Sequence, residues 1–337
     1  MAINGVSSLA TSNAQIGRLK DLSATLADLE RQVATSKKTD TLAGLGSDAS
    51  TVQNLRINKN ALDTYNANID TATNRINLMS STMTTISDQA RQLISSIQSQ
   101  VRGGNVDIAT ISQQAKEILS FVSDAANVQI DGRYVFAGSD TTSPPVSDQS
   151  SINTNMQQQV SDWLNGTITT DQLGSNVDAL STTQLGINPG QSAAGAVTVR
   201  ADSTTEINYT VKANNSGMQD IMRALGLAAN LTSPGAGDTP NLTDLDNVLS
   251  KITDIAQKGA DALDTSNAQL GSKYTLLNSI QTNNSTDANT FESIYSDKEN
   301  ADTTEAVAKI QSLQTQLQAS YQVTSIVSQL SLVNFIS

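Results

Sequence analysis

Apolar side chains recur with heptad spacing near both ends of this chain. Near the start, steps of three and four residues connect Leu19, Leu22, Leu26, Leu29 and Val33. Near the end, a matching stripe comprises Ile310, Leu313 and Leu317 and, after a phase shift, Val323, Ile326, Leu330 and Val333. Such a stripe lies along one face of a helix and must be buried against other helices. We therefore expect the two ends to pair with each other or with neighbouring copies, and we take these residues as the candidate assembly interface.

The composition limits the core that the chain can build. Of its 337 residues, 37% are hydrophobic and 3% are aromatic, which is less apolar than a typical globular domain. Long helical bundles need fewer apolar residues, because each helix buries only one stripe. We therefore expect a mainly α fold, an elongated antiparallel helical bundle or coiled coil formed by the N-terminal and C-terminal halves, with a small β-rich inserted domain.

Charge and missing residue types exclude several classes of protein. The formal net charge is −12, which repels nucleic acid and anionic lipid. Cysteine and histidine are both absent, so disulfides, Cys/His zinc sites and His-based catalytic triads cannot form. The N-terminus lacks the pattern of a cleaved signal peptide, and no run of 18 apolar residues occurs. We expect no nucleic-acid partner, no membrane insertion, no metal and no cofactor.

Apolar spacing of three and four residues predicts long helices in both halves of the chain. In the N-terminal half it runs from Leu55 to Val101, and after Gly103-Gly104 it resumes over 108–125 with Asn105 or Asp107 as the cap. In the C-terminal half it covers about 218–228, 242–295 and 304–335. The order of elements is almost the same from either end, so we expect the 55–97 rod to pack against 108–125 and 245–277.

The middle of the chain has a different pattern. The segment VQIDGRYVFAG predicts a hairpin around Asp131-Gly132, and alternating residues over 197–211 predict a second hairpin. Residues 146–195 are polar and only weakly periodic, and Trp163 among them is expected to fill a small local core. The expected domains are an N-terminal assembly helix (1–42), two halves of a helical rod (43–133 and 218–300), a β-containing outer insertion (134–217) and a C-terminal assembly helix (301–337).

Polar residues interrupt the apolar stripe of the second long helix. Asn267, Gln281 and Asn284 occupy positions that face the core in this pattern. Such residues cost stability but can fix the register between paired helices. We therefore expect them to align the two halves of the rod.

Several stretches resemble the bacterial flagellin family. The segment SSLATSNAQIGRLKDLSATLADLERQVATSKKTD is similar to the N-terminal region of flagellins. The segments DGRYVFAGSDTTSPPV and NADTTEAVAKIQSLQTQLQASYQVTSIVSQLSLVNFIS are similar to those of hook–filament junction proteins of the type called hook-associated protein 3. The sequence departs from many relatives at ATSKKTD, where they carry an SSGKR-like stretch, but the pair Lys37-Lys38 keeps the positive charge.

This resemblance implies a structural protein of the bacterial flagellum, exported unfolded through the flagellum-specific type III apparatus. Its terminal helices would form the inner tube, its long helices the next shell, and its insertion would face outward. The implied partners are other copies of the chain in a ring, flagellin, the other hook-associated junction protein and a flagellar export chaperone that masks the C-terminal stripe. The implied location is extracellular, at the hook–filament junction, without a cleaved signal peptide.

Other functions stay open at this stage. Flagellin itself shares the terminal stripes, and a flagellin-like surface protein could bind glycans through the insertion around Trp163. The chain lacks a G-x-S-x-G elbow, a P-loop and a dinucleotide-binding glycine motif. The carboxylates of Asp244 and Asp246 could serve a glycosidase, but acidic residues at a helix start are more simply explained as caps or dipole partners. We therefore expect a non-enzymatic protein.

Marginal stability of isolated polar amphipathic helices affects the ends of the chain. We expect both termini to be disordered in the monomer and to fold on assembly. This coupling would keep the subunit soluble and competent for export until it reaches the growing tip.

Overall fold

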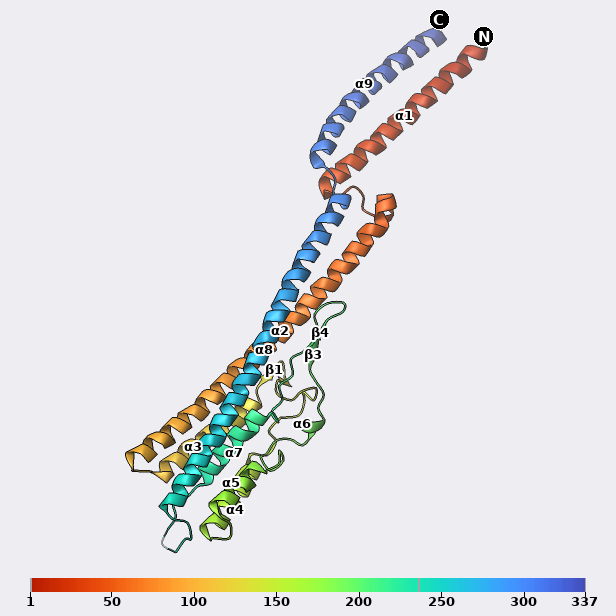
Figure 1. The fold of residues 1–337 in the computed structure, drawn as a ribbon. Coiled ribbons are helices and arrows are strands. Elements are labelled where there is room, and N and C mark those ends of the chain that lie inside the picture. The colour runs from red at the N-terminus through yellow and green to blue at the C-terminus, as the bar shows by residue number, and fades with distance from the viewer. Residues whose placement is uncertain (1, 236, 337) are drawn as a thin grey trace. The chain divides into compact units, whose positions relative to one another are not determined.

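The chain is largely helical (Figure 1) in a computed structural model that describes residues 2–235 and 237–336. Side chains are described except for those of residues 1–9, 11, 12, 236 and 327–337. The helices are α1 (Ala2–Thr35), η1 (Leu42–Asp48, 3-10), α2 (Ala49–Gly103), α3 (Ile108–Ala126), α4 (Gln149–Leu164), α5 (Thr170–Asp178), α6 (Gly190–Ala193), α7 (Ser216–Asn230), α8 (Leu242–Glu299) and α9 (Thr303–Ile336). The strands are β1 (Gln129–Ile130), β2 (Arg133–Tyr134), β3 (Thr198–Arg200) and β4 (Glu206–Asn208). The expected mainly α bundle with a small β insertion is confirmed.

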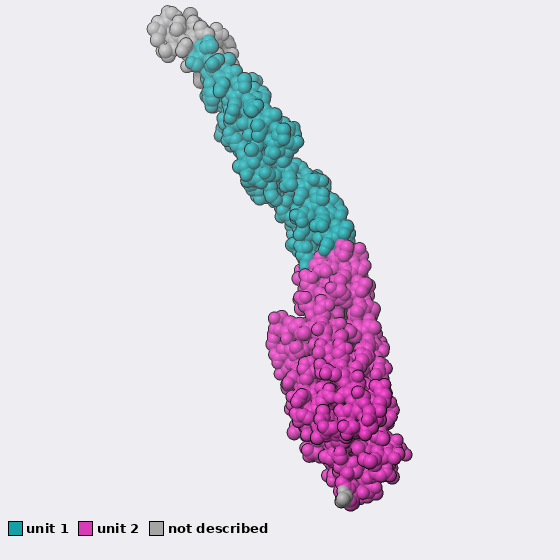
Figure 2. Space-filling model, turned by 90° about the vertical axis from the view of Figure 1, so that its left-hand side faces the viewer, with its two compact units in different colours: residues 1–63, 285–337 teal, residues 64–284 magenta. Residues whose placement is uncertain are grey.

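The chain divides into two compact units, coloured separately in Figure 2. Unit 1 comprises residues 1–63 and 285–337, and unit 2 comprises residues 64–284. Unit 1 therefore joins the two ends of the chain, while unit 2 contains the entire middle. Among the described residues, no helix combines the length and the apolar character needed to cross a membrane.

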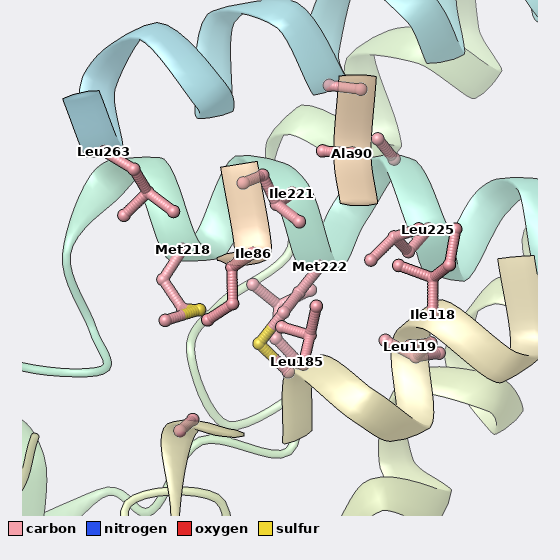
Figure 3. Packing of buried hydrophobic residues seen from close by; sticks show 14 of the residues in the cluster. Ile86, Ala90, Ile118, Leu119, Leu185, Met218, Ile221, Met222, Leu225 and Leu263 are labelled. Atoms are coloured by element: carbon pink, nitrogen blue, oxygen red, sulfur yellow. The ribbon is translucent and has the colours of Figure 1, made fainter. Parts of the chain in front are cut away.

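Unit 2 is built around a core to which α2, α3, α7 and α8 contribute, together with α4 and α5. The labelled side chains in Figure 3 converge from α2 (Ile86), α3 (Leu119), α7 (Met222) and α8 (Leu263). Helix α3 is antiparallel to α7, since the Ser112 hydroxyl near its start donates to the carbonyl of Ala229 near the end of α7 (2.6 Å). The apolar stripes predicted from the sequence thus form one continuous core.

Two glycines let α7 and α8 approach each other closely. A Cβ atom at Gly217 would lie 2.8 Å from the carbonyl oxygen of Gly259, and one at Gly259 would lie 2.8 Å from the backbone nitrogen of Ile221. Both contacts are with backbone, which cannot move aside as a flexible side chain can. The backbones of the two helices are therefore in direct contact, and only glycine leaves room for this.

The two predicted hairpins are confirmed. In the first, Ile130 pairs with Arg133 across a turn of Asp131 (φ +50°) and Gly132 (φ +71°). Such left-handed conformations are the reason that Asp-Gly sequences favour this turn. In the second, Val199 pairs with Ile207, and both side chains are buried in the core of unit 2.

The polar segment 146–195 is more regular than its weak periodicity indicated. It forms helices α4 and α5, and α5 begins with a capping box between Thr169 and Gln172. Trp163 is 1% exposed, and its indole nitrogen donates to the hydroxyl of Thr170 (3.1 Å). The expectation that Trp163 fills the core is confirmed.

Candidate assembly interface

The terminal helices α1 and α9 pack against each other within unit 1. On α1, Leu29 is buried, and the other four predicted residues, Leu19, Leu22, Leu26 and Val33, are partly buried. On α9, Leu317 is 7% exposed, while Ile310 and Leu313 are partly buried. These eight residues lie where the sequence predicted them, along one helix–helix seam, which we call the terminal seam.

The predicted phase shift in the C-terminal stripe does not occur in the terminal seam. Beyond Leu317, the partly buried positions of α9 are Ser320 and Thr324, which continue the same three-and-four spacing. Val323 and Ile326 are instead 51% and 56% exposed. A helix that keeps one face toward its partner cannot shift phase without turning, so the polar residues stay in the seam, Val323 lies at its border and Ile326 lies outside it.

Leu330 and Val333 complete the predicted stripe, but their side chains lie outside the described residues. Their backbone belongs to α9. Their part in assembly stays a prediction.

A groove opens where the terminal seam becomes polar. Its volume is ≈ 250 Å³. Gln15, Arg18 and Leu19 line it on α1, and the seam residues Ser320 and Thr324 line it on α9 together with Ala319 and Val323. The two helices are therefore least tightly packed here, because short hydroxyl side chains fill less of the space between them than leucines do.

Beside the terminal seam, the helices of unit 1 carry apolar side chains that nothing covers. Ile16 on α1 is 56% exposed, as is Ile326 on α9, and Tyr321 on α9 is 57% exposed. Single exposed apolar residues are ordinary on a protein surface, whereas neighbouring ones on one helix indicate a contact surface. The predicted residues Val323 and Ile326 are three apart and therefore neighbours on one flank of α9, so this pair remains a candidate for contact with another molecule.

Polar contacts align α2 with α8 within unit 2. The amide of Gln281 donates to a carboxylate oxygen of Asp70 (2.6 Å), and that of Asn267 donates to the hydroxyl of Thr84 (3.0 Å). Asn284 instead donates to the carbonyl of Ala201 in the β3–β4 turn (2.8 Å). Two of the three predicted polar positions therefore bridge the rod, while the third holds the second hairpin against α8.

An ionic cluster lies beyond the bridge between Asn267 and Thr84, toward the end of α2 and the start of α8. Arg91 on α2 is 2.6 Å from a carboxylate oxygen of Asp264 on α8, and it also donates to the buried hydroxyl of Ser87 (2.8 Å). The hydrogen bond from Arg91, followed by that from Ser87 and the charge of Arg91, lowers the pKa of Asp264 despite partial burial. The sequence showed no sign of this cluster, because its members lie on the edge of the apolar stripe.

The arrangement offers little to the alternative chemistries. Trp163 is buried, so its ring faces cannot serve as a platform for a sugar. Asp244 lies in the first turn of α8, where its carboxylate accepts from the backbone nitrogen of Asn241 (2.9 Å). Among the described residues, no three acidic side chains gather as a metal site.

Parts of this chain are similar to known proteins. Residues 252–336 match the family model described as the bacterial flagellin C-terminal helical region. A comparison with curated proteins finds no match. A solved structure described as a flagellar hook-associated protein from Vibrio parahaemolyticus is 12% identical, covers 75% of this chain and 97% of its own, and has a TM-score of 0.49. A likeness of that size carries no argument about function.

The matched segment begins within α8, at residue 252, and extends to the end of α9, at residue 336. It contains every candidate interface residue of α9. Residues 252–336 are thus similar to the C-terminal helical region of bacterial flagellins, which agrees with the flagellin-type resemblance of the sequence.

Proposed function

We propose that this chain is a structural subunit of the bacterial flagellum that joins the hook to the filament. In this role it forms a ring on which flagellin polymerises. The observation that carries the proposal is a set of exposed apolar side chains of α9, with Val323 and Ile326 on one flank of the terminal seam and Tyr321 on the other, within a flagellin-type helical region. A helix with one face in the terminal seam and further apolar side chains in solvent needs a neighbour to cover them.

The proposed layers follow the five segments of the sequence. The segments 1–42 and 301–337 form the inner tube, 43–133 and 218–300 form the surrounding shell, and 134–217 faces outward. Unit 1 supports the first part of this scheme, because it pairs the two terminal segments.

The proposed partners are further copies of the chain, flagellin and the other hook-associated junction protein. A flagellar export chaperone would cover the C-terminal stripe before secretion, since that stripe contains exposed apolar side chains. Export would proceed unfolded through the type III apparatus, to an extracellular position at the junction. A chaperone that still binds after removal of residues 304–337 would contradict its assigned site.

Folding of the terminal helices is coupled to assembly in this proposal. The terminal seam buries few large side chains completely, so two helices of this kind gain little stability in water. We expect proteases to remove both termini from the free subunit and to leave them intact in the assembled form. Resistance of the termini in the monomer would refute the coupling.

Flagellin itself is the second candidate, because it shares the C-terminal helical region. The GRYVFAG segment and the LSLVNFIS ending resemble the junction protein more closely and favour the first candidate. A flagellin-like surface protein that binds glycans is the third, and the burial of Trp163 weighs against it.

Immunogold labelling of intact isolated flagella tests the three candidates together. A single narrow band where hook meets filament would support the junction role. Label along the whole filament would identify a filament subunit, and absence of label from flagella would return attention to a surface protein. Binding of a glycan by residues 134–216 would specifically support the third candidate.

A further inference from the structure

The two breaks between helices that flank the terminal helices, one after α1 and one after α8, lie side by side within unit 1. Lys37, after α1, forms an isolated antiparallel bridge with Asn300, after α8. The backbone nitrogen of Lys38 donates to the carbonyl of Glu299 (2.8 Å), and that of Ala301 donates to the carbonyl of Ser36 (3.0 Å). We call this pairing of 36–38 with 299–301 the joint. It fixes the end of α1 relative to the beginning of α9.

A buried carboxylate lies at the centre of the joint. The side chain of Glu299 is 7% exposed and accepts from Lys37 (3.0 Å) and from Arg56 on α2 (2.6 Å). The two cations are themselves 46% and 43% exposed, so only the acid is withdrawn from water. A buried acid without both partners would be costly, because charge in a desolvated site is strongly unfavourable.

Further contacts place positive charge at the C-terminal end of α8. The ammonium of Lys38 donates to the carbonyls of Asp297 (3.1 Å) and Lys298 (2.8 Å), which are among the last carbonyls of the helix. Cations are favourable at this end of a helix because of its dipole. Lys298 in turn pairs with Asp48 in η1 (2.7 Å), so residues from both breaks and from both rod helices meet here.

We propose that Glu299 is an electrostatic latch that holds the joint closed and thereby sets the register of the terminal seam. While Glu299 is ionised, Lys37 and Arg56 tie the segment after α1 and the start of α2 to the end of α8. The bridge between Lys37 and Asn300 then places α1 and α9 in one alignment. Without the negative charge, Lys37 and Arg56 repel each other and the backbone pairing loses its support.

The latch responds to acid. Burial alone would raise the pKa of the Glu299 carboxyl, but the hydrogen bonds and charges of Lys37 and Arg56 outweigh burial and lower the pKa below its ordinary value of 4.5. The latch therefore contributes fully above about pH 4.5 and is lost as the pH falls through the lowered pKa. A cleft of ≈ 350 Å³ lined by Glu299, Lys37, Arg56 and Asp40 lets water and protons reach the carboxylate. Other charged groups at the joint are Lys38, Lys298, Asp48 and Arg31, which donates to the carbonyl of Lys38 (2.9 Å) and pairs with Asp40.

Hydrogen–deuterium exchange of the full-length chain tests the latch at the amides that it supports. In Glu299→Gln, we expect the amides of Lys38 and Ala301 to exchange about tenfold faster than in the wild type, because charge-assisted hydrogen bonds are lost. The matched control is Glu292→Gln, which removes an exposed acid of the same helix that is 3.6 Å from Lys59. This control should leave both amides unchanged.

Two further measurements keep the test decisive. Arg56→Met removes one cation only, so it should accelerate exchange at the same amides by less than Glu299→Gln does. In the wild type, protection factors corrected for intrinsic exchange should fall as the pH is lowered progressively below 4.5, and in Glu299→Gln they should change little. Unchanged protection of both amides in Glu299→Gln would overturn the proposal, as would a uniform loss of protection that extends through unit 2.

Discussion

Unit 1 and unit 2 use the same kind of long polar helix but bury it to different extents. In unit 2, α2, α3, α7 and α8 share a continuous core in which many large side chains are fully buried (Figure 3). In unit 1, the buried hydrophobic residues among the described side chains are Leu29, Val52, Ala288, Ala306 and Leu317. In unit 2, several helices surround each apolar stripe. In unit 1, the contact of two helices leaves the flanks of each stripe in water.

This difference separates folding from assembly. Unit 2 needs no other molecule to complete its core, while unit 1 exposes eight of the large apolar residues whose side chains are described: Ile16, Leu42, Ile57, Ile294, Val307, Tyr321, Val323 and Ile326. We infer that unit 2 is stable by itself and that unit 1 reaches full stability against neighbours. The lone tryptophan, Trp163, lies in unit 2, so its fluorescence reports on unit 2 while circular dichroism reports on both.

The largest effect is expected from a charge in the terminal seam. Leu317→Asp should abolish assembly, because an unpaired charge at a position that is 7% exposed costs several kcal/mol. The unfolding transition followed by Trp163 fluorescence should stay unchanged. Electron microscopy of assembled material and a denaturant titration measure the two properties.

Gln314→Asp places the same charge on an exposed position of the same helix and serves as the control. It should assemble normally. Normal assembly of Leu317→Asp would count against the terminal seam, and a shifted Trp163 transition would count against the independence of unit 2.

Truncation of one leucine in each unit should have unequal effects. Leu225→Ala, in a position that is 1% exposed, should lower the free energy of unfolding of unit 2 by about 2–5 kcal/mol. Leu26→Ala, in a partly buried position of the terminal seam, should cost about 1 kcal/mol and leave the Trp163 transition in place. Urea unfolding, monitored by both signals, distinguishes them. Equal costs at the two positions would remove the contrast between the units.

Two glycines of α8 should respond in opposite directions to the same substitution. Gly259→Ala forces a Cβ against the backbone of α7 and should destabilise unit 2 by about 1–3 kcal/mol. Gly271→Ala adds a Cβ into open space on an exposed helix face and should stabilise the helix by about 0.5–1 kcal/mol. Thermal unfolding followed by Trp163 fluorescence measures both. Stabilisation by Gly259→Ala would show that α7 and α8 do not need close backbone contact.

The smallest effect is expected from the ionic cluster of α2 and α8. The hydrogen bond from Arg91 lowers the pKa of Asp264, so the carboxylate stabilises unit 2 above the ordinary pKa of 3.8 and this stabilisation is lost as the pH falls through the lowered value. Asp264 is 49% exposed, so solvent reduces the effect to less than about 1 kcal/mol. Asp264→Asn should lower stability at pH 7, and its difference from the wild type should shrink as the pH falls below 3.8. A difference that does not shrink in acid would assign the effect to packing.

Helix position and turn chemistry were readable from the sequence. The apolar spacing of the long helices predicted α2, α3, α7, α8 and α9, and Asp107, one of the two residues proposed as the cap of α3, accepts from the backbone nitrogen of Ala109. These features depend on neighbours in sequence, which is why pattern alone reveals them. The Asp-Gly turn of the first hairpin belongs to the same class.

Features that depend on distant residues were harder to predict. Ser320 and Thr324 belong to the terminal seam because α1 faces them, and no local pattern distinguishes them from surface residues. The helix α4 does have a helical pattern of apolar residues in its sequence. Its buried residues are spaced by four, four and three positions: Ile152, Met156, Val160 and Trp163. The joint around Glu299 joins positions more than two hundred residues apart in sequence, which only the fold brings together.

The terminal seam has a direction. Its side chains are aliphatic at Leu29 and Val33, near the joint, and become polar toward Gln15 and Thr324, where the groove opens. Two helices joined in this way close first at the joint and separate first at their free ends, because the contacts that retain them weaken along their length. An incoming copy would therefore contact α1 and α9 near their free ends, where they separate most readily, while the two helices stay packed together near the joint.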